Sequence, residues 1–206
     1  MQAYELEGHG GSETVIGKAL TAAPELRSKA FVTTKVSRGP FTPETIRASC
    51  ERSLSRLQQD SLELLQLHHF RAGPRKNPRT GKEETAPSIE EQMAGLKALQ
   101  DDGMIKYIGL NNANAAQLQM AWRAPPPRAD KQQPSRYHPP LLCRDTGVRF
   151  HTVQVRYHLF SRYIEKEVIP WCREHGVGIL AHSVLGKGLC TGKLSLSLLL
   201  LLLFKL

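Results

Sequence analysis

Cysteine is scarce in this chain of 206 residues, and its few copies lack the spacing of a disulfide framework or a zinc site. The four cysteines lie far apart and include no Cys-x-x-Cys pair: Cys50, Cys143, Cys172 and Cys190. The class of disulfide-rich secreted domains is therefore excluded, and we expect no metal centre. This usage indicates a reducing compartment and a cytoplasmic protein. A plastid location stays open, because the amino terminus reads as truncated and shows no signal peptide.

A long apolar run is also missing. The carboxyl-terminal stretch Leu194–Leu206 is rich in leucine but holds 13 residues, whereas a helix that spans a bilayer needs about 20. We therefore interpret 194–206 as a low-complexity tail and expect no membrane association. A tail anchor and an altered reading frame or unspliced sequence are the alternative interpretations.

Acidic residues are too few to balance the basic ones, and the formal net charge is +9. Much of the excess lies in two segments that we expect to be loops, Arg71–Lys82 and Arg123–Arg149, and not on a helix face with interleaved aromatics. We therefore expect no nucleic-acid partner. The charge favours attraction of a phosphorylated cofactor. The second segment is proline-rich and predicts a disordered insertion at about 123–149. A ligand for a proline-reading module and a miscalled intron are alternatives.

What the chain does contain is a series of five apolar segments that end in polar side chains, at 30–35, 62–68, 105–112, 152–157 and 177–183. Runs of this length, rich in Val and Leu, predict parallel strands. Lys35 ends the first and His68 the second. Ligands bind at the carboxyl ends of such strands, so we expect both side chains to face one pocket. Alone, Lys35 is equally compatible with a solvated lysine, and His68 with a core or loop histidine.

Helical patterns separate these segments. Thr42 as N-cap and Pro43 in the first turn begin one helix, and a capping box at 88–91 begins the next, which runs to Gly103. A third helix is expected from Asn114, and a fourth from Glu165 to about 176, with Pro170 in its first turn or bending it. The alternation predicts an α/β protein with a parallel sheet, which is either a barrel or doubly wound.

Several motifs, in order, resemble the aldo-keto reductase family. They are Tyr4 with 11–13 and 16–20, then 31–36, 52–57, 64–68, 108–112, 154–157, 181–188 and 191–193. The resemblance implies a (β/α)8 TIM barrel that binds NADPH. This barrel is incomplete here, because residues 1–193 supply about five of eight strands, the family's third to seventh.

The resemblance also implies a catalytic set of Tyr4, Lys35 and His68. A tyrosine would give a proton to the carbonyl oxygen that receives hydride, and the ammonium of Lys35 would favour release of that proton. His68 would orient the substrate carbonyl and share in proton delivery. The family's catalytic aspartate has no counterpart in this chain, and Glu5 stands where the family usually has glycine.

Cofactor contacts carry over in the same way. Asn111, Asn112 and Gln154 fall where the family holds the nicotinamide carboxamide, and Asn111 replaces a usual serine. His182 occupies a position where many members stack a tyrosine on the nicotinamide. The residues expected at the pyrophosphate are Ser183, Leu185 and Lys187.

We therefore expect NADPH-dependent reduction of an aldehyde or ketone, impaired by truncation in this chain. The expected partner is a small-molecule carbonyl substrate, whose identity the sequence leaves open, as it does the oligomeric state. Two alternatives remain at this stage. One is a catalytically inert barrel fragment that binds NADPH or a partner, and the other is a gene-model product that does not fold.

Overall fold

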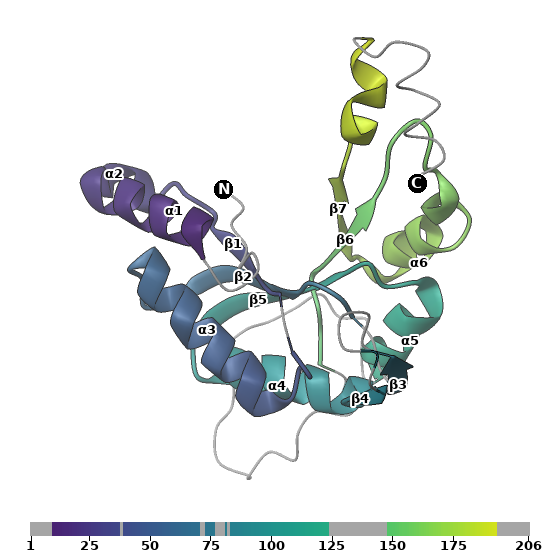
Figure 1. Ribbon diagram of the computed structural model, residues 1–206, viewed down its shortest axis with the longest axis horizontal. Coiled ribbons are helices and arrows are strands. Elements are labelled where there is room, and N and C mark those ends of the chain that lie inside the picture. Colours follow the sequence, from purple (N-terminus) through teal and green to yellow (C-terminus); the bar gives the residue numbers. More distant parts are fainter. Residues whose placement is uncertain are drawn as a thin grey trace.

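A five-stranded parallel sheet forms the centre of the computed structural model, which describes residues 10–37, 39–70, 73–76, 81, 83–123 and 148–192 (Figure 1). Its strands are β1 (Thr33–Val36), β2 (Leu62–Leu67), β5 (Ile105–Asn111), β6 (Thr152–Arg156) and β7 (Gly178–His182). All neighbours pair in parallel. The five strands that the sequence predicts are confirmed, with differences of a few residues at their ends.

The order of the strands decides between the two parallel architectures. The order is β1-β2-β5-β6-β7, so each new parallel strand is added at the same edge of the sheet and the sheet grows in one direction. A doubly wound sheet reverses this direction at a switch point, and none occurs among the described strands. In Figure 1, β6 and β7 turn away from β1, β2 and β5. The sheet is therefore an arc of a barrel, and a doubly wound sheet is excluded.

Helices precede the first strand and connect the parallel strands. They are α1 (Gly11–Ala22), α2 (Pro24–Arg27), α3 (Pro43–Leu57), α4 (Ile89–Asp101), α5 (Ala115–Arg123) and α6 (Val168–His175). The Thr42 side chain accepts a hydrogen bond from the Thr45 N–H in the first turn of α3, and Ser88 with Glu91 forms the capping box of α4. Gly176, at φ 67°, ends α6. The cap signals in the sequence are therefore confirmed.

Some elements differ from the sequence-based expectation. Helix α1 was not predicted, because it begins after Gly10 without a side-chain cap. Strands β3 (Gly73–Lys76) and β4 (Glu83–Ala86) form an antiparallel hairpin in a segment expected to be a loop. The fourth helix begins at Val168 and not at Glu165, because Tyr163–Glu165 forms a separate 3-10 turn. Pro170 lies in the first turn of α6.

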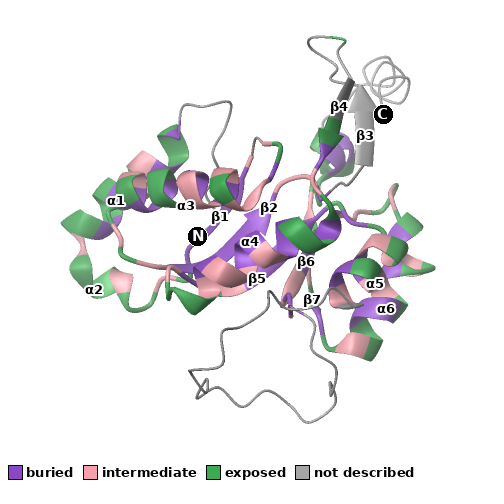
Figure 2. Ribbon diagram, turned by 90° about the horizontal axis from the view of Figure 1, so that it is seen from below, coloured by how far each residue is buried: buried purple, intermediate pink, exposed green. Residues whose placement is uncertain are grey.

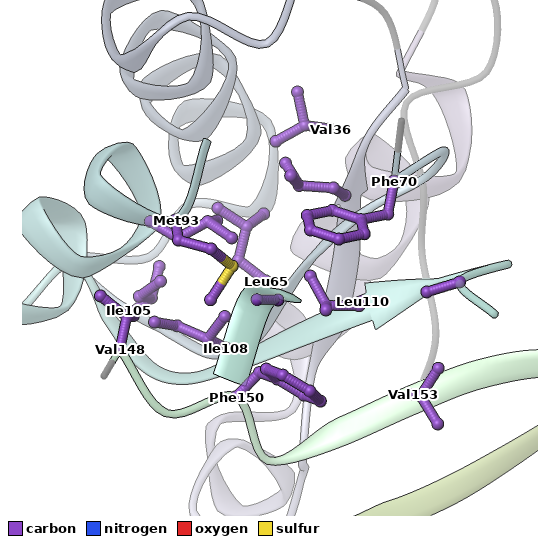
Figure 3. Packing of buried hydrophobic residues seen from close by; sticks show 14 of the residues in the cluster. Val36, Leu65, Phe70, Met93, Ile105, Ile108, Leu110, Val148, Phe150 and Val153 are labelled. Carbon is purple, nitrogen blue, oxygen red and sulfur yellow. The ribbon is translucent and has the colours of Figure 1, made fainter. Parts of the chain in front are cut away.

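The hydrophobic core lies between the sheet and its helices. Met93 of α4 packs toward Leu65 of β2 and Ile108 of β5 (Figure 3). Farther along the sheet, the Trp122 ring lies 5.5 Å from Phe150 in an edge-to-face contact. Figure 2 shows that burial concentrates on the strands while the outer helix faces are exposed. One face of the arc is thus covered by helices.

Helix α1 is fixed to this core by a buried carboxylate. Glu13 is 0% exposed, accepts a hydrogen bond from the Thr34 hydroxyl, and pairs with Arg56 Nε at 2.6 Å. Gly17 permits the close contact between α1 and α3, because a Cβ there would lie 2.4 Å from the Arg56 carbonyl oxygen. The close packing at Gly17 and the buried ion pair of Glu13 with Arg56 therefore hold α1 against α3.

Some sequence-based predictions lie outside the described residues. They include Tyr4, Cys143, the core of the proline-rich insertion (124–147) and the leucine-rich tail (194–206). Within the described part, Cys50 and Cys172 are buried free thiols and Cys190 is an exposed one. No helix in that part is long and apolar enough to cross a membrane.

Replacing Gly17 by alanine tests the packing of α1 on α3. Overpacking against backbone atoms costs about 1–3 kcal/mol, and the better helix propensity of alanine returns up to about 1 kcal/mol. Gly17→Ala is therefore expected to lower the midpoint of thermal unfolding. Gly11→Ala is the matched control in the same helix, because nothing lies within 4 Å of its Cβ position. Equal melting of both variants, followed by circular dichroism, would contradict the assigned contact.

Candidate active site

The face of the arc opposite the helices is concave and carries an aligned set of side chains. Lys35 pairs with Gln66, and Gln66 with Gly109. Farther along, Asn111 pairs with Gln154 and Arg156 with His182. Because paired residues of neighbouring strands share a face, and every second residue returns to it, these side chains lie on one surface. A hollow of about 720 Å³ opens on the same face, lined by Thr33, Leu64, Tyr107, Thr152, Gln154 and Leu180 among others. Neither Lys35 nor His68 lines this hollow, so the expectation that both face one pocket is not met by it.

Lys35 and His68 meet at the carboxyl end of this surface. His68 follows β2 directly, and its N–H donates to the Val36 carbonyl at 3.0 Å. Lys35 is 5% exposed, and burial lowers the pKa of its ammonium to about 8. Burial lowers the pKa of both His68 and His182, and neighbouring groups that include Lys35 lower it further. The structure therefore brings these three predicted site residues into one electrostatic cluster.

His68 is a neutral imidazole in this setting. Its pKa is lowered to about 4, first by burial and then by His69, Lys35 and His182. The His69 ring stacks on it, with ring centroids 4.6 Å apart. At neutral pH an imidazole with this pKa carries one N–H donor and no net charge. It can therefore donate a hydrogen bond to an oxygen atom without acting as a strong acid.

Asn111 offers a buried acceptor. Its Nδ2 donates to the His68 carbonyl at 2.7 Å, which fixes the backbone beside the imidazole. Among the described residues its Oδ1 has no hydrogen-bond partner, and Asn111 is 2% exposed. An unsatisfied buried acceptor costs about 1–3 kcal/mol. A donor supplied by a ligand would remove this cost.

Asn112 connects β5 with β6 and β7. Its φ of 57° is left-handed, a conformation that asparagine tolerates better than most residues. Its backbone N–H donates to the Gln154 carbonyl at 2.8 Å, and its Oδ1 lies 3.1 Å from His182 Nε2. Gln154 itself is 5% exposed and lies on the concave face. The predicted carboxamide contacts thus lie together at one end of the sheet.

The loop after β7 carries the remaining predicted contacts. His182 Nδ1 lies 3.0 Å from Ser183 Oγ, and both Ser183 and Lys187 have positive φ angles, of 56° and 55°. The Gly186 N–H donates to the Ser183 carbonyl at 2.7 Å, so the chain makes a tight turn directly after β7. Leu185 and Lys187 are exposed in the same loop. This loop lies at the carboxyl end of β7, next to the cluster around Lys35.

Two residues of this surface were missed at the sequence level. Gln66 lies two residues before His68 and is 0% exposed, and neither of its side-chain polar atoms has a hydrogen-bond partner in the part of the chain that the structure describes. Arg156 lies two residues after Gln154. The alternation of strand side chains, counted from the predicted residues, places both on the same face. That period of two was the signal that would have identified them.

Gly109 explains how the Gln66 side chain fits between its neighbours. A Cβ at position 109 would lie 2.6 Å from Thr152 Oγ1 and 2.8 Å from Gln66 Cγ. Glycine is therefore the residue that leaves room for both side chains below the site.

Comparison with known proteins finds one family model and relatives of the same kind. The family model described as the aldo/keto reductase family matches residues 2–197. A probable aldo-keto reductase 1 from Glycine max is 31% identical over 198 residues, which cover 92% of this chain and 46% of the relative. The methylglyoxal reductase YeaE of Escherichia coli (strain K12) is 30% identical over 183 residues, covering 89% of this chain and 51% of the relative.

Solved structures show the same relationship in space. An aldo/keto reductase from Klebsiella pneumoniae in complex with NADP and acetate superposes with a TM-score of 0.67 at 26% identity, covering 91% of this chain and 53% of that one. A glycerol dehydrogenase from Gluconobacter oxydans gives a TM-score of 0.69 at 26% identity, covering 95% and 52%. The chain spans about half the length of the relatives that it matches. Its five strands are an incomplete (β/α)8 barrel, and the chain belongs to the aldo/keto reductase family.

Proposed function

We propose that the protein carrying this chain reduces an aldehyde or ketone to an alcohol with NADPH. The observation that carries the proposal is the desolvated ammonium of Lys35 beside the neutral imidazole of His68, at the carboxyl end of the sheet. Membership of the family supports it. A relative named as a methylglyoxal reductase and a neighbour solved with NADP support the reaction type and the cofactor.

In this proposal Lys35 sets the acidity of the proton donor. The donor is Tyr4, which lies outside the described residues. An ammonium beside a phenol stabilises the phenolate, so it lowers the phenol pKa from about 10 and eases proton release. Burial of Lys35 strengthens that effect, because a charge acts over a longer range where water is scarce. The proton then goes to the substrate oxygen as negative charge develops there.

His68 positions the substrate. Its neutral ring donates a hydrogen bond to the carbonyl oxygen, and the Asn111 amide holds the adjoining backbone. With a pKa of about 4, His68 is unsuited to be the main proton donor at neutral pH. The proposal therefore separates orientation by His68 from proton transfer by Tyr4.

The chain's residues fit the nicotinamide end of NADPH. The unsatisfied Oδ1 of Asn111 is an acceptor for a carboxamide N–H, and Asn112 and Gln154 complete a polar cradle. His182 would lie against the ring, and the loop with Ser183, Leu185 and Lys187 against the pyrophosphate. When bound, NADPH supplies the hydride that reduces the carbonyl carbon.

The proposal also includes the cellular compartment of the protein and its partner. The buried free thiols of Cys50 and Cys172 support a reducing compartment, and we place the protein in the cytoplasm. Its partner in this function is a small carbonyl compound.

The shifted pKa of Lys35 can be measured directly. In protein with 15N-labelled lysine side chains, the Lys35 signal is identified by its loss in Lys35→Met and is expected to titrate near pH 8, below its ordinary value of 10.5. The sign follows from burial, which disfavours the charged form and lowers a lysine pKa. Exposed Lys29 in the same protein is the internal comparison. A Lys35 midpoint above pH 10 would refute the desolvated site.

Substitution of the proposed proton donor and its lysine tests the reaction. In the full protein, Tyr4→Phe and Lys35→Met are expected to lower kcat with 4-nitrobenzaldehyde by about 10²–10⁴-fold, because both act where charge develops in the transition state. NADPH affinity should change little. Lys29→Met is the matched control for Lys35→Met. Full turnover by Tyr4→Phe, measured by NADPH oxidation, would exclude Tyr4 as the donor.

A third substitution tests the cofactor cradle. Gln154→Ala is expected to weaken NADPH binding by about 3–10-fold, since a hydrogen bond contributes about 0.5–1.5 kcal/mol. The measurement is a fluorescence titration of the full protein with NADPH. Gln100→Ala is the control, because Gln100 bonds the Lys106 carbonyl near the other end of β5. Unchanged NADPH affinity in Gln154→Ala would remove Gln154 from the cofactor site.

A further inference from the structure

Arg156 is a cation without a counterion on the concave face. It is the last residue of β6, is half-buried, and pairs in register with His182 of β7. Throughout the described ranges, no hydrogen bond or ion pair involves its guanidinium. An arginine with five free donors in a partly desolvated position is costly unless an acceptor meets it. Its position calls for an anionic ligand.

The charged and titratable groups that act on His68 and His182 are positive or neutral, and they include Arg156. Burial and neighbouring cationic groups lower the pKa of His68 and His182, and no carboxylate contributes to either shift. Glu165, a carboxylate of the segment after β6, is held by Arg162 and Tyr157. Within the described part, no group of His, Cys, Asp and Glu side chains could hold a metal ion. The end of the sheet is therefore suited to an anion and not to a cation.

The distance across the sheet limits the size of the ligand. Neighbouring strands lie about 4.8 Å apart, so β2 and β6, which flank β5, are separated by about 10 Å. The side chains of His68 and Arg156 extend from these strands into the concave face. A small molecule with a carbonyl at one end and an anionic group at the other matches a strand separation of this order.

We propose that Arg156 binds a carboxylate carried by the carbonyl substrate, so that the protein prefers carbonyl acids over neutral aldehydes. The inference rests on the proposed reduction and adds a substrate class to it. The planar guanidinium matches a carboxylate with two parallel hydrogen bonds, while His68 holds the carbonyl. Arg156 is thus a specificity-determining residue, and it takes no part in proton transfer.

A phosphate of the cofactor is the other source of an anionic oxygen group. The loop that contains Ser183 and Lys187 is the candidate for the pyrophosphate, and it follows β7. Arg156 lies instead on the strand face beside Gln154, at the proposed nicotinamide end. Its position therefore favours the substrate.

A pair of isosteric aldehydes tests the proposal in the full protein. 4-Carboxybenzaldehyde and 4-nitrobenzaldehyde have the same shape, but the first alone carries a charge. In the unmodified protein, kcat/KM should be higher for 4-carboxybenzaldehyde than for 4-nitrobenzaldehyde. The ratio of the first value to the second should fall by about 10–100-fold in Arg156→Gln, because the variant loses charge-assisted hydrogen bonds to the carboxylate. Arg156→Lys, which keeps the charge but not the paired geometry, should fall in between. Arg173→Gln, an exposed arginine of α6, is the charge-matched control.

Equilibrium binding keeps the test independent of catalysis. By calorimetry without NADPH, 4-carboxybenzaldehyde should bind the unmodified protein at least about 10-fold more tightly than Arg156→Gln, with matching circular dichroism of the two. Equal affinity of the unmodified protein and Arg156→Gln for 4-carboxybenzaldehyde would overturn the proposed role of Arg156, whether or not the protein reduces either aldehyde. If the protein reduces neither aldehyde, the proposed reaction is refuted, and the binding comparison still tests Arg156. A loss of NADPH affinity in Arg156→Gln with an unchanged aldehyde ratio would assign Arg156 to the cofactor and also overturn it.

Discussion

The parallel, in-register pairing of five strands is the constraint on which the rest of the molecule depends. It directs every second side chain of each strand toward the helices and the others toward the concave face. The helix side becomes a continuous hydrophobic core. The concave side collects Lys35, Gln66, Gln154 and Arg156, which are distant in sequence. One hydrogen-bonding pattern therefore provides both the packing of the fold and the composition of the site.

The electrostatics of the site follow from that arrangement. Lys35 is buried, so its ammonium is poorly solvated and its pKa is lowered. Its field then lowers the pKa of His68 and His182. The result is a site with fixed positive charge and neutral imidazole donors, which suits an oxygen atom that gains negative charge. The same field suits an anionic substrate group at Arg156.

Much of this could be predicted from the residues. The Thr42 cap, the capping box at 88–91 and the five apolar runs are local signals, and local hydrogen bonds satisfy them in the structure. Helix α1 was missed because its anchor is not local. Glu13 bonds Thr34 and Arg56, which lie 21 and 43 positions away in the sequence. The placement of Lys35 and His68 at the same end of the sheet followed from strand direction alone. The placement of Arg156 required counting every second residue along β6 from Gln154.

The sequence by itself determined that five strands form, where α3 and α4 begin, and which residues follow each strand, because these depend on side-chain periodicity and on caps within a few positions. It left a barrel and a doubly wound sheet both open. Only the tertiary structure decided between them, through a strand order that never reverses. It also decided which polar groups lose their water, as at Lys35, and which keep no partner, as at Asn111 Oδ1. The burial of a polar side chain and its hydrogen-bond partners depend on segments far apart in the chain, so no local sequence pattern predicts them.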